Sequence, residues 1–223
     1  MFSRIWIVLL IMVLLSSCTT PKSASINTNT ECSYDRARLM AMDEQHFDQD
    51  LANGGGGWRA IASIHGCEST AADLIRDYRK THDSRSSILY WHEGQLRAVA
   101  GDYAHAIALM ERTRRPISMD GWNDYVEATI AFLRRDRAAL ADARAKLAKL
   151  QWKSGSGYPP VKNGFVELTM TDGQTVKMRW PPNLDVVDGL IRCFGRSYRI
   201  AYHDCRAPSH QRYKLFKERS SYN

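Results

Sequence analysis

The chain has 223 residues, of which 44% are apolar and 25% are charged, and its formal net charge is +7. This composition is typical of a globular protein and excludes a chain that is too polar to form a core. A basic surface suits anionic lipid, lipopolysaccharide, nucleic acid or an acidic protein. Nucleic acid is the least expected of these partners, because the chain carries no nucleic-acid-binding motif.

Residues 1–17 have the pattern of a signal peptide. Arg4 supplies one positive charge, and an unbroken apolar run occupies residues 5–15. That run is shorter than the roughly 20 residues that a membrane-spanning helix needs. It has the length of the apolar region of a signal peptide, and small residues then precede Cys18. An uncleaved N-terminal anchor with a coincidental cysteine is the alternative.

The segment Leu15-Ser16-Ser17-Cys18 resembles the lipobox of bacterial lipoproteins. The resemblance implies that the Cys18 thiol is diacylated, that cleavage follows before this residue and that the new amino group is acylated. Several acyl chains hold a protein stably on a membrane. Thr19 follows where an aspartate would retain an enteric lipoprotein in the inner membrane, so we expect the outer membrane, facing the periplasm. Residues 18–33 are then the lipid anchor and a flexible tether.

Four further cysteines support this compartment. An even number of cysteines in an exported protein predicts disulfides, here with three possible connectivities. We expect Cys32–Cys67 and Cys193–Cys205, because each pair lies within one end of the chain. A Cys–His dyad and a zinc site around His203 are alternatives, but the spacing matches no familiar zinc site.

Residues 34–152 are predicted to be helical, beginning with one helix over residues 34–51. The four glycines at 54–57 predict a flexible connection, because no Gly-Lys-Ser/Thr follows them as in a phosphate loop. A period of 34 residues then sets in. It relates three small residues, three acidic residues and three apolar residues, which are Ala60, Gly94 and Ala128; Glu68, Asp102 and Asp136; and Ala72, Ala106 and Leu140.

This period resembles that of the tetratricopeptide repeat (TPR), whose unit is a helix–turn–helix of 34 residues. The middle unit is the clearest, with Gly94 and the run Gly101-Asp102-Tyr103. Glu93 and Arg97 depart from the apolar and aromatic residues of the family's first helix. The resemblance covers residues 58–150 and implies helical hairpins with a surface that binds peptides or protein domains.

A linker at residues 153–162 is predicted to precede a small α+β unit at 163–207 and a basic tail at 208–223. Apolar residues alternate over 165–170 and 175–180, which predicts a β-hairpin with one apolar face. Because an isolated hairpin is barely stable, we expect this face to pack on the helices. A helix is predicted over residues 185–194, with Asn183 or Asp185 as its cap.

These elements predict a mainly α fold, with TPR-like helical hairpins and a small C-terminal unit of a β-hairpin plus helix. The chain has no serine elbow, HExxH motif or phosphate loop. We therefore expect a protein that is not an enzyme, with no catalytic residue, no metal and no cofactor. An envelope hydrolase that uses Asp185 and Asp188, or a histidine, is an alternative. A scaffold that binds lipid or peptidoglycan through the basic tail is another.

A protein partner is the expected ligand. It is either a secreted antibacterial toxin or envelope enzyme, which this protein would inhibit as immunity lipoproteins do, or an envelope assembly complex, which it would serve as an adaptor. Aromatic residues and arginines anchor most protein interfaces. The expected anchors are Trp58, Tyr90, Arg97, Arg134 and Arg137.

Replacing Cys18 by serine is expected to abolish lipid attachment, because serine lacks the thiol that receives the diacylglycerol. Incorporation of labelled palmitate and partition between membrane and soluble fractions measure this. The wild-type chain and a Ser17→Ala control should be labelled and sediment with membranes. Labelling of the Cys18→Ser variant, or an unlabelled wild-type chain, would contradict the prediction.

Overall fold

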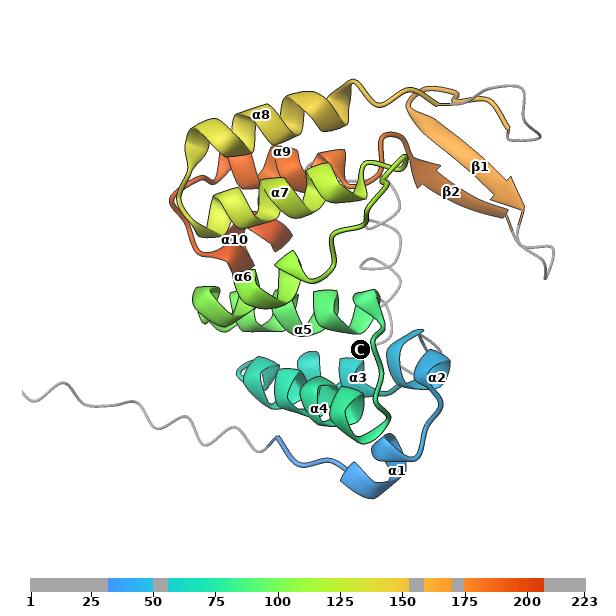
Figure 1. Ribbon diagram of the computed structural model, residues 1–223, viewed down its shortest axis with the longest axis vertical. Coiled ribbons are helices and arrows are strands. Elements are labelled where there is room, and N and C mark those ends of the chain that lie inside the picture. Colours follow the sequence, from blue (N-terminus) through green and yellow to red (C-terminus); the bar gives the residue numbers. More distant parts are fainter. Residues whose placement is uncertain (1–31, 50–55, 153–158, 170–174, 207–223) are drawn as a thin grey trace, which may run out of the picture.

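The computed structural model describes residues 32–49, 56–152, 159–169 and 175–206 (Figure 1). Within these ranges the chain forms ten helices and one two-stranded antiparallel sheet. A mainly α fold with a small β-hairpin is thereby confirmed. The helices stack on one another, and the hairpin projects from one end of the stack. Cys18, two of the four glycines (Gly54 and Gly55) and the basic tail lie outside the described residues.

The N-terminal half of the stack surrounds the first disulfide. Cys32 is bonded to Cys67 with their Cα atoms 5.6 Å apart, as expected, and this bond ties the segment before α1 to the residue that precedes α4. The helices of this half are α1 (Arg36–Met40), α2 (Glu44–Gln49), α3 (Trp58–Ala62), α4 (Glu68–Thr81) and α5 (Ser87–Val99).

The single helix predicted over residues 34–51 is wrong. The chain forms α1 and α2 instead, because aspartates start two separate helices. The Asp35 carboxylate accepts a hydrogen bond from the Arg38 N–H, and the Asp43 carboxylate accepts one from the His46 N–H, each at 2.9 Å. Such a bond satisfies a backbone donor that has no partner inside the helix, so it favours a helix start at each aspartate.

Gly57, the last of the four glycines, has a packing role. Its φ is +62°, a conformation that side-chain-bearing residues rarely adopt, and it directly precedes α3. A Cβ at this position would lie 1.9 Å from the carbonyl oxygen of Phe47 in α2. Only glycine therefore allows α2 and the start of α3 to approach so closely.

The C-terminal half of the stack contains the remaining five helices of the described ranges. The helices are α6 (Tyr103–Glu111), α7 (Trp122–Leu133), α8 (Arg137–Ala148), α9 (Leu184–Arg192) and α10 (Tyr198–His203). The second expected disulfide is also present. It joins Cys193, at the end of α9, to Cys205, just beyond α10, with their Cα atoms 6.2 Å apart.

The 34-residue period corresponds to a repeated turn. Asp102 caps α6 by accepting a bond from the His105 N–H at 3.4 Å, and Asp136 caps α8 by accepting one from the Ala139 N–H at 2.9 Å. Each aspartate follows a residue with positive φ, Gly101 at 88° and Arg135 at 61°. The α5–α6 and α7–α8 hairpins therefore turn in the same way, while the TPR arrangement as a whole stays a prediction.

The three small residues of the period were expected to lie where two helices pack closely, and one of them does not. At Gly94 of α5, a Cβ would lie 3.1 Å from the Met110 Cγ and 3.3 Å from the Ala106 carbonyl oxygen of α6, so these two helices approach closely. Ala128 of α7 is fully buried. Ala60 of α3 is exposed, which makes the first unit an exception, because α3 is only five residues long.

Two apolar cores meet at α5. Leu89 and Leu96 of this helix belong to the core that α1 to α4 form, whereas Trp91 and Ala98 belong to the core of α6 to α10. The second core includes side chains from α9 and α10, which lie far along the chain. Helix α5 is thus the element on which both halves of the stack pack.

The hairpin consists of β1 (Phe165–Thr169) and β2 (Thr175–Arg179). Val166 pairs with Met178 and Leu168 with Val176, so the predicted apolar face exists. The expectation that this face packs on the helices is wrong for its outer part: Val166 is fully buried, but 43% of Val176 is exposed. The hairpin projects away from the helical stack (Figure 1).

Two tryptophan rings pack against each other at the base of the hairpin. The rings of Trp152 and Trp180 meet edge to face with centroids 4.5 Å apart. The Trp180 Nε1–H donates to the carbonyl of Leu150 at 3.3 Å, and the Trp152 Nε1–H donates to that of Pro159 at 2.9 Å. These contacts attach the hairpin to the segment that follows α8.

The predicted C-terminal helix exists with shifted bounds, since α9 covers Leu184–Arg192. Asn183 occupies the cap position with a φ of 60°, but its side chain makes no capping hydrogen bond. Asp185 lies in the first turn, where a negative charge suits the helix dipole.

Gly94→Val is expected to lower the free energy of unfolding by about 2 kcal/mol, because the added methyl groups overpack the contact between α5 and α6. Ala104→Val, at an exposed position of α6, is the matched control and should cost less than about 0.7 kcal/mol. Chemical denaturation of the oxidised chain measures both values. Equal stability of the two variants would show that α5 and α6 do not approach as described.

Candidate partner-binding surface

Trp58, the first expected anchor, is a core residue. Only 5% of it is exposed, and its Nε1–H donates to the Asp48 carboxylate at 2.8 Å. It therefore cannot insert into a partner.

Asp48 joins α2, α3 and α5. It is 1% exposed, and its Oδ1 lies 2.7 Å from the Nδ1 of His92. Burial alone would raise the pKa of Asp48, but hydrogen bonds from His92 and Trp58 and the charge of Arg59 lower it below its ordinary value. His92 lines a cleft of about 300 Å³ between α3, α5 and α10. The buried Asp48 carboxylate is therefore compensated by Trp58, Arg59 and His92, and these contacts hold α2, α3 and α5 together.

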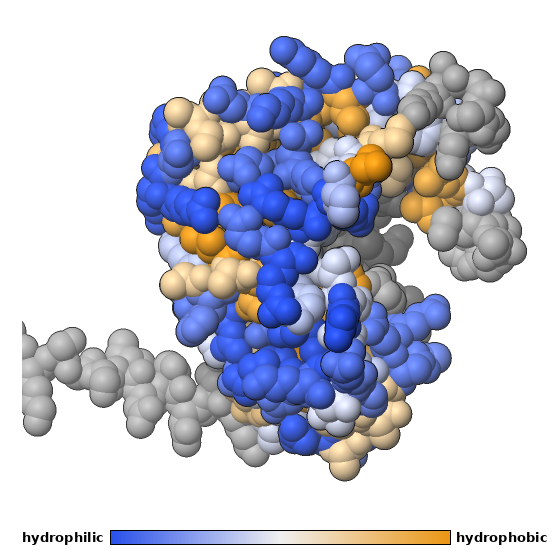
Figure 2. Space-filling model, viewed as in Figure 1, coloured by the Kyte–Doolittle hydropathy of each residue, from blue (hydrophilic) through white to orange (hydrophobic). Residues whose placement is uncertain are grey.

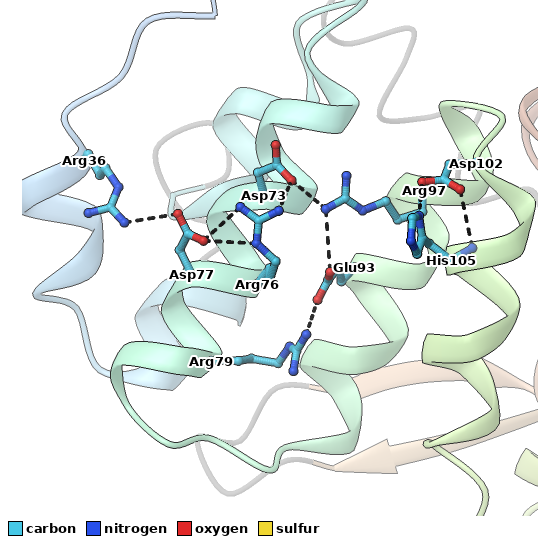
Figure 3. A network of polar contacts seen from close by, with 9 residues as sticks. All are labelled: Arg36, Asp73, Arg76, Asp77, Arg79, Glu93, Arg97, Asp102 and His105. Carbon is cyan, nitrogen blue, oxygen red and sulfur yellow. Dashed lines mark hydrogen bonds and ion pairs between the residues drawn. The ribbon is translucent and has the colours of Figure 1, made fainter.

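Arg97 is held by carboxylates on its own helix and on α4. Its guanidinium lies 2.6 Å from Asp73 and 3.7 Å from Glu93. Figure 3 shows the chain of alternating charges to which these residues belong, which runs from Arg36 of α1 through Asp73 and Arg97 to Arg79 of α4. The separate pair of Asp102 and His105 lies beside it at the start of α6. Only 14% of the Arg97 side chain is exposed, and its Nη2 contacts both carboxylates of the network.

Tyr90 lies between two guanidinium groups. The Cζ atoms of Arg79 and Arg112 are 3.8 Å and 4.4 Å from its ring centroid. Arg79 is buried and forms an ion pair with Glu93, which is also buried. Tyr90 thus contributes to the internal packing of α4, α5 and α6, and only part of its ring remains accessible.

Arg134 and Arg137 are exposed where α7 gives way to α8. Arg134 forms an ion pair with Glu111 at 3.3 Å, and the Cζ of Arg137 lies 4.4 Å from the Phe194 ring centroid. Of the five expected anchors, these two are the most accessible to a partner, and they lie apart from Trp58 and Arg97 on different helices.

The acid pair of the hydrolase alternative is engaged in ion pairs. Asp185 is bound by Arg206 at 2.6 Å, and Asp188 by Arg144 at 2.9 Å. The thiols of the alternative Cys–His dyad and zinc site are disulfide sulfurs. Within the described ranges, no cluster of three or more His, Cys, Asp or Glu residues has the arrangement of a metal site.

A groove at the base of the hairpin brings several accessible apolar side chains together. We call it the hairpin groove; its volume is about 500 Å³, and it is lined by Met119, Asp120, Gln151, Trp152, Leu168, Met178, Trp180 and Pro182. Met119, in the loop between α6 and α7, is 58% exposed. Figure 2 shows hydrophobic residues at the surface around the hairpin, on a molecule that is otherwise largely hydrophilic in this view. Large exposed apolar groups in a concave site are typical of binding surfaces.

The alternation of the hairpin in the sequence predicted only part of this groove, namely Leu168, Met178 and Trp180. The rest was missed, because residues such as Met119 and Trp152 lie in irregular segments without a periodic pattern.

A scan of protein-family models, a search of curated proteins and a search of solved structures found no match to this chain. Among the described residues, no helix is both long enough and apolar enough to cross a membrane.

Asp48→Ala is expected to destabilise the fold by about 2 kcal/mol at neutral pH, because it leaves the donors of Trp58 and His92 without an acceptor. The pKa of Asp48 is lowered in the folded state, so its contribution is complete above the unfolded value of about 3.9 and is lost as the pH falls through the folded value. The deficit of the variant should therefore shrink in acid.

Denaturation curves from neutral pH to strong acid measure this difference. Asp142→Ala, at an exposed position of α8, is the control and should remain within about 0.5 kcal/mol of the wild type throughout. A deficit for Asp48→Ala that does not depend on pH would refute the proposed role of its charge.

Proposed function

We propose that this chain is a lipid-anchored protein of the bacterial envelope that binds a protein partner through the hairpin groove. We propose further that it acts as an inhibitor of a secreted antibacterial effector or envelope enzyme. The lipobox-like segment supports the anchor, and the two disulfides support an oxidising compartment such as the periplasm.

The hairpin groove is the observation that carries the proposal. It combines two tryptophans, two methionines and a leucine in one concave surface, in which Met119 is 58% exposed. Val176, on the same face of the hairpin as Leu168 and Met178, is 43% exposed. Tryptophan and methionine are enriched in the centres of protein interfaces. Covering such a surface with a complementary partner removes its apolar area from water, which is the main favourable term in association.

The contacts at the base of the hairpin support inhibition because they restrict the conformation of the groove. The Trp152 and Trp180 rings pack together, and the Trp180 Nε1–H donates to the Leu150 carbonyl, which joins the hairpin to the segment after α8. A preorganised surface loses little conformational freedom on binding, which favours the tight complexes that inhibition requires. The repeated Asp102 and Asp136 turns support a TPR-like origin for the stack, with a scaffold role in place of the expected concave binding face.

Affinity capture with the oxidised mature chain, carrying serine at position 18, tests the proposal. Envelope and secreted extracts are applied, and mass spectrometry identifies what is retained. We expect one partner, which forms a stable complex after purification and whose toxic or enzymatic activity falls when the chain is added.

The variants Met119→Asp and Val176→Asp place a charge at the groove and should weaken this complex by about 30-fold or more. Ile64→Asp is the matched control, because Ile64 is also an exposed apolar residue, at 39%, but lies between α3 and α4. Repeated failure to capture any partner, or equal binding by all three variants, would refute the proposal.

A further inference from the structure

We infer that the hairpin groove receives an extended segment of the partner, which pairs with the outer edge of β2 and has alternating apolar and acidic side chains. This inference rests on the proposed function and specifies the chemistry of the partner at the same site.

The backbone of β2 presents a free edge. The Trp180 N–H donates to the Gly164 carbonyl at 2.9 Å, so Gly164 and Trp180 are a hydrogen-bonded pair of the two strands. Bonded pairs alternate in an antiparallel ladder, so Val176 and Met178 also bond towards β1. The N–H and C=O groups of Thr175, Lys177 and Arg179 therefore point outward, and no described residue forms a backbone hydrogen bond with them.

The other outer edge is partly occupied. Lys162 folds back beside Phe165, and these two residues exchange backbone hydrogen bonds of 2.8 Å and 2.9 Å. The outward-pointing N–H and C=O of Phe165, at the start of β1, are therefore already hydrogen-bonded. An incoming strand consequently has a longer unpaired edge on β2 than on β1.

The groove lies on one face of that edge. Val176 and Met178 point to the groove side, so alternate side chains of an added strand would lie next to them and enter the space beside Met119 and Trp152. Apolar side chains fit these positions, because the lining is dominated by apolar and aromatic groups.

The opposite face of the same edge is cationic. The Nζ of Lys177 and the Cζ of Arg179 lie 4.9 Å and 5.2 Å from the Phe165 ring centroid, and neither side chain forms a salt bridge with a described residue. Glu167 is the acidic residue opposite Lys177, and it lies on β1, away from the free edge. The remaining side chains of an added strand would therefore meet two cations, and acidic residues complement them.

Lys177→Pro tests the backbone pairing. Proline removes the outward N–H and blocks the edge, but leaves the bonds of Val176 and Met178 to β1 intact, and proline is tolerated on edge strands. Lys177→Gln is the matched control, which removes the charge and keeps the N–H. We expect Lys177→Pro to weaken the captured complex by about 30-fold or more and Lys177→Gln by less than about tenfold.

A short capped peptide in which valine and glutamate alternate serves as an independent probe. It should slow hydrogen exchange at the amides of Lys177 and Arg179 and change the fluorescence of Trp152 and Trp180, whereas a peptide that alternates valine with lysine should do neither. Circular dichroism and amide spectra verify that each variant is folded.

Several results would overturn the inference. One is a complex that Met119→Asp weakens but Lys177→Pro does not, which would leave the groove as a binding site without strand addition. Others are protection of these amides by self-association as the protein concentration rises, or by vesicles of anionic lipid without any peptide. In the first case the partner would still bind at the hairpin groove although no strand is added to β2, so the two proposals are tested separately.

Discussion

Helix α5 is the element on which the rest of the structure depends, because it is buried on two sides. Leu89 and Leu96 pack into the core of α1 to α4, and Trp91 and Ala98 pack into the core of α6 to α10. Glu93 adds a buried charge to this helix, with Arg79 and Arg97 as its partners. A buried carboxylate that lost these partners would be strongly destabilising, so the ion pairs restrict how α4 and α5 can pack.

This arrangement explains why three of the five expected anchors, Trp58, Tyr90 and Arg97, are engaged within the helical stack, whereas Arg134 and Arg137 are exposed. The aromatic and arginine side chains of the repeat region are used to hold helices together: Trp58 binds Asp48, Tyr90 lies between two guanidinium groups, and Arg97 is held by Asp73. Among the described residues, no helix covers the outer part of the hairpin, and apolar side chains are exposed there at Met119 and Val176. The proposed function rests on this contrast: the three anchors of the helical stack are engaged in contacts between helices, whereas apolar side chains at the hairpin are exposed.

The sequence predicted those features that local chemistry determines. The helical class, the hairpin with its apolar face and both disulfides follow from periodicity and cysteine position, and the 34-residue period relates Asp102 to Asp136. The division of residues 34–51 into two helices was also readable in principle, since Asp43 is a capping residue. What could not be predicted depends on tertiary packing: whether Trp58 is buried, and that Met119 in a loop meets Trp152 and the hairpin.

The most direct test of the binding surface is site-specific photo-crosslinking in intact cells. A benzophenone amino acid is introduced at Met119, or at Ile64 as the control, in the full-length chain in the bacterium that makes it. The account predicts a discrete crosslinked product between position 119 and one envelope or secreted protein, and no such product from position 64. Crosslinking from position 64 to the same protein, or the absence of any product from position 119, would contradict the claim that the hairpin groove is the partner-binding surface.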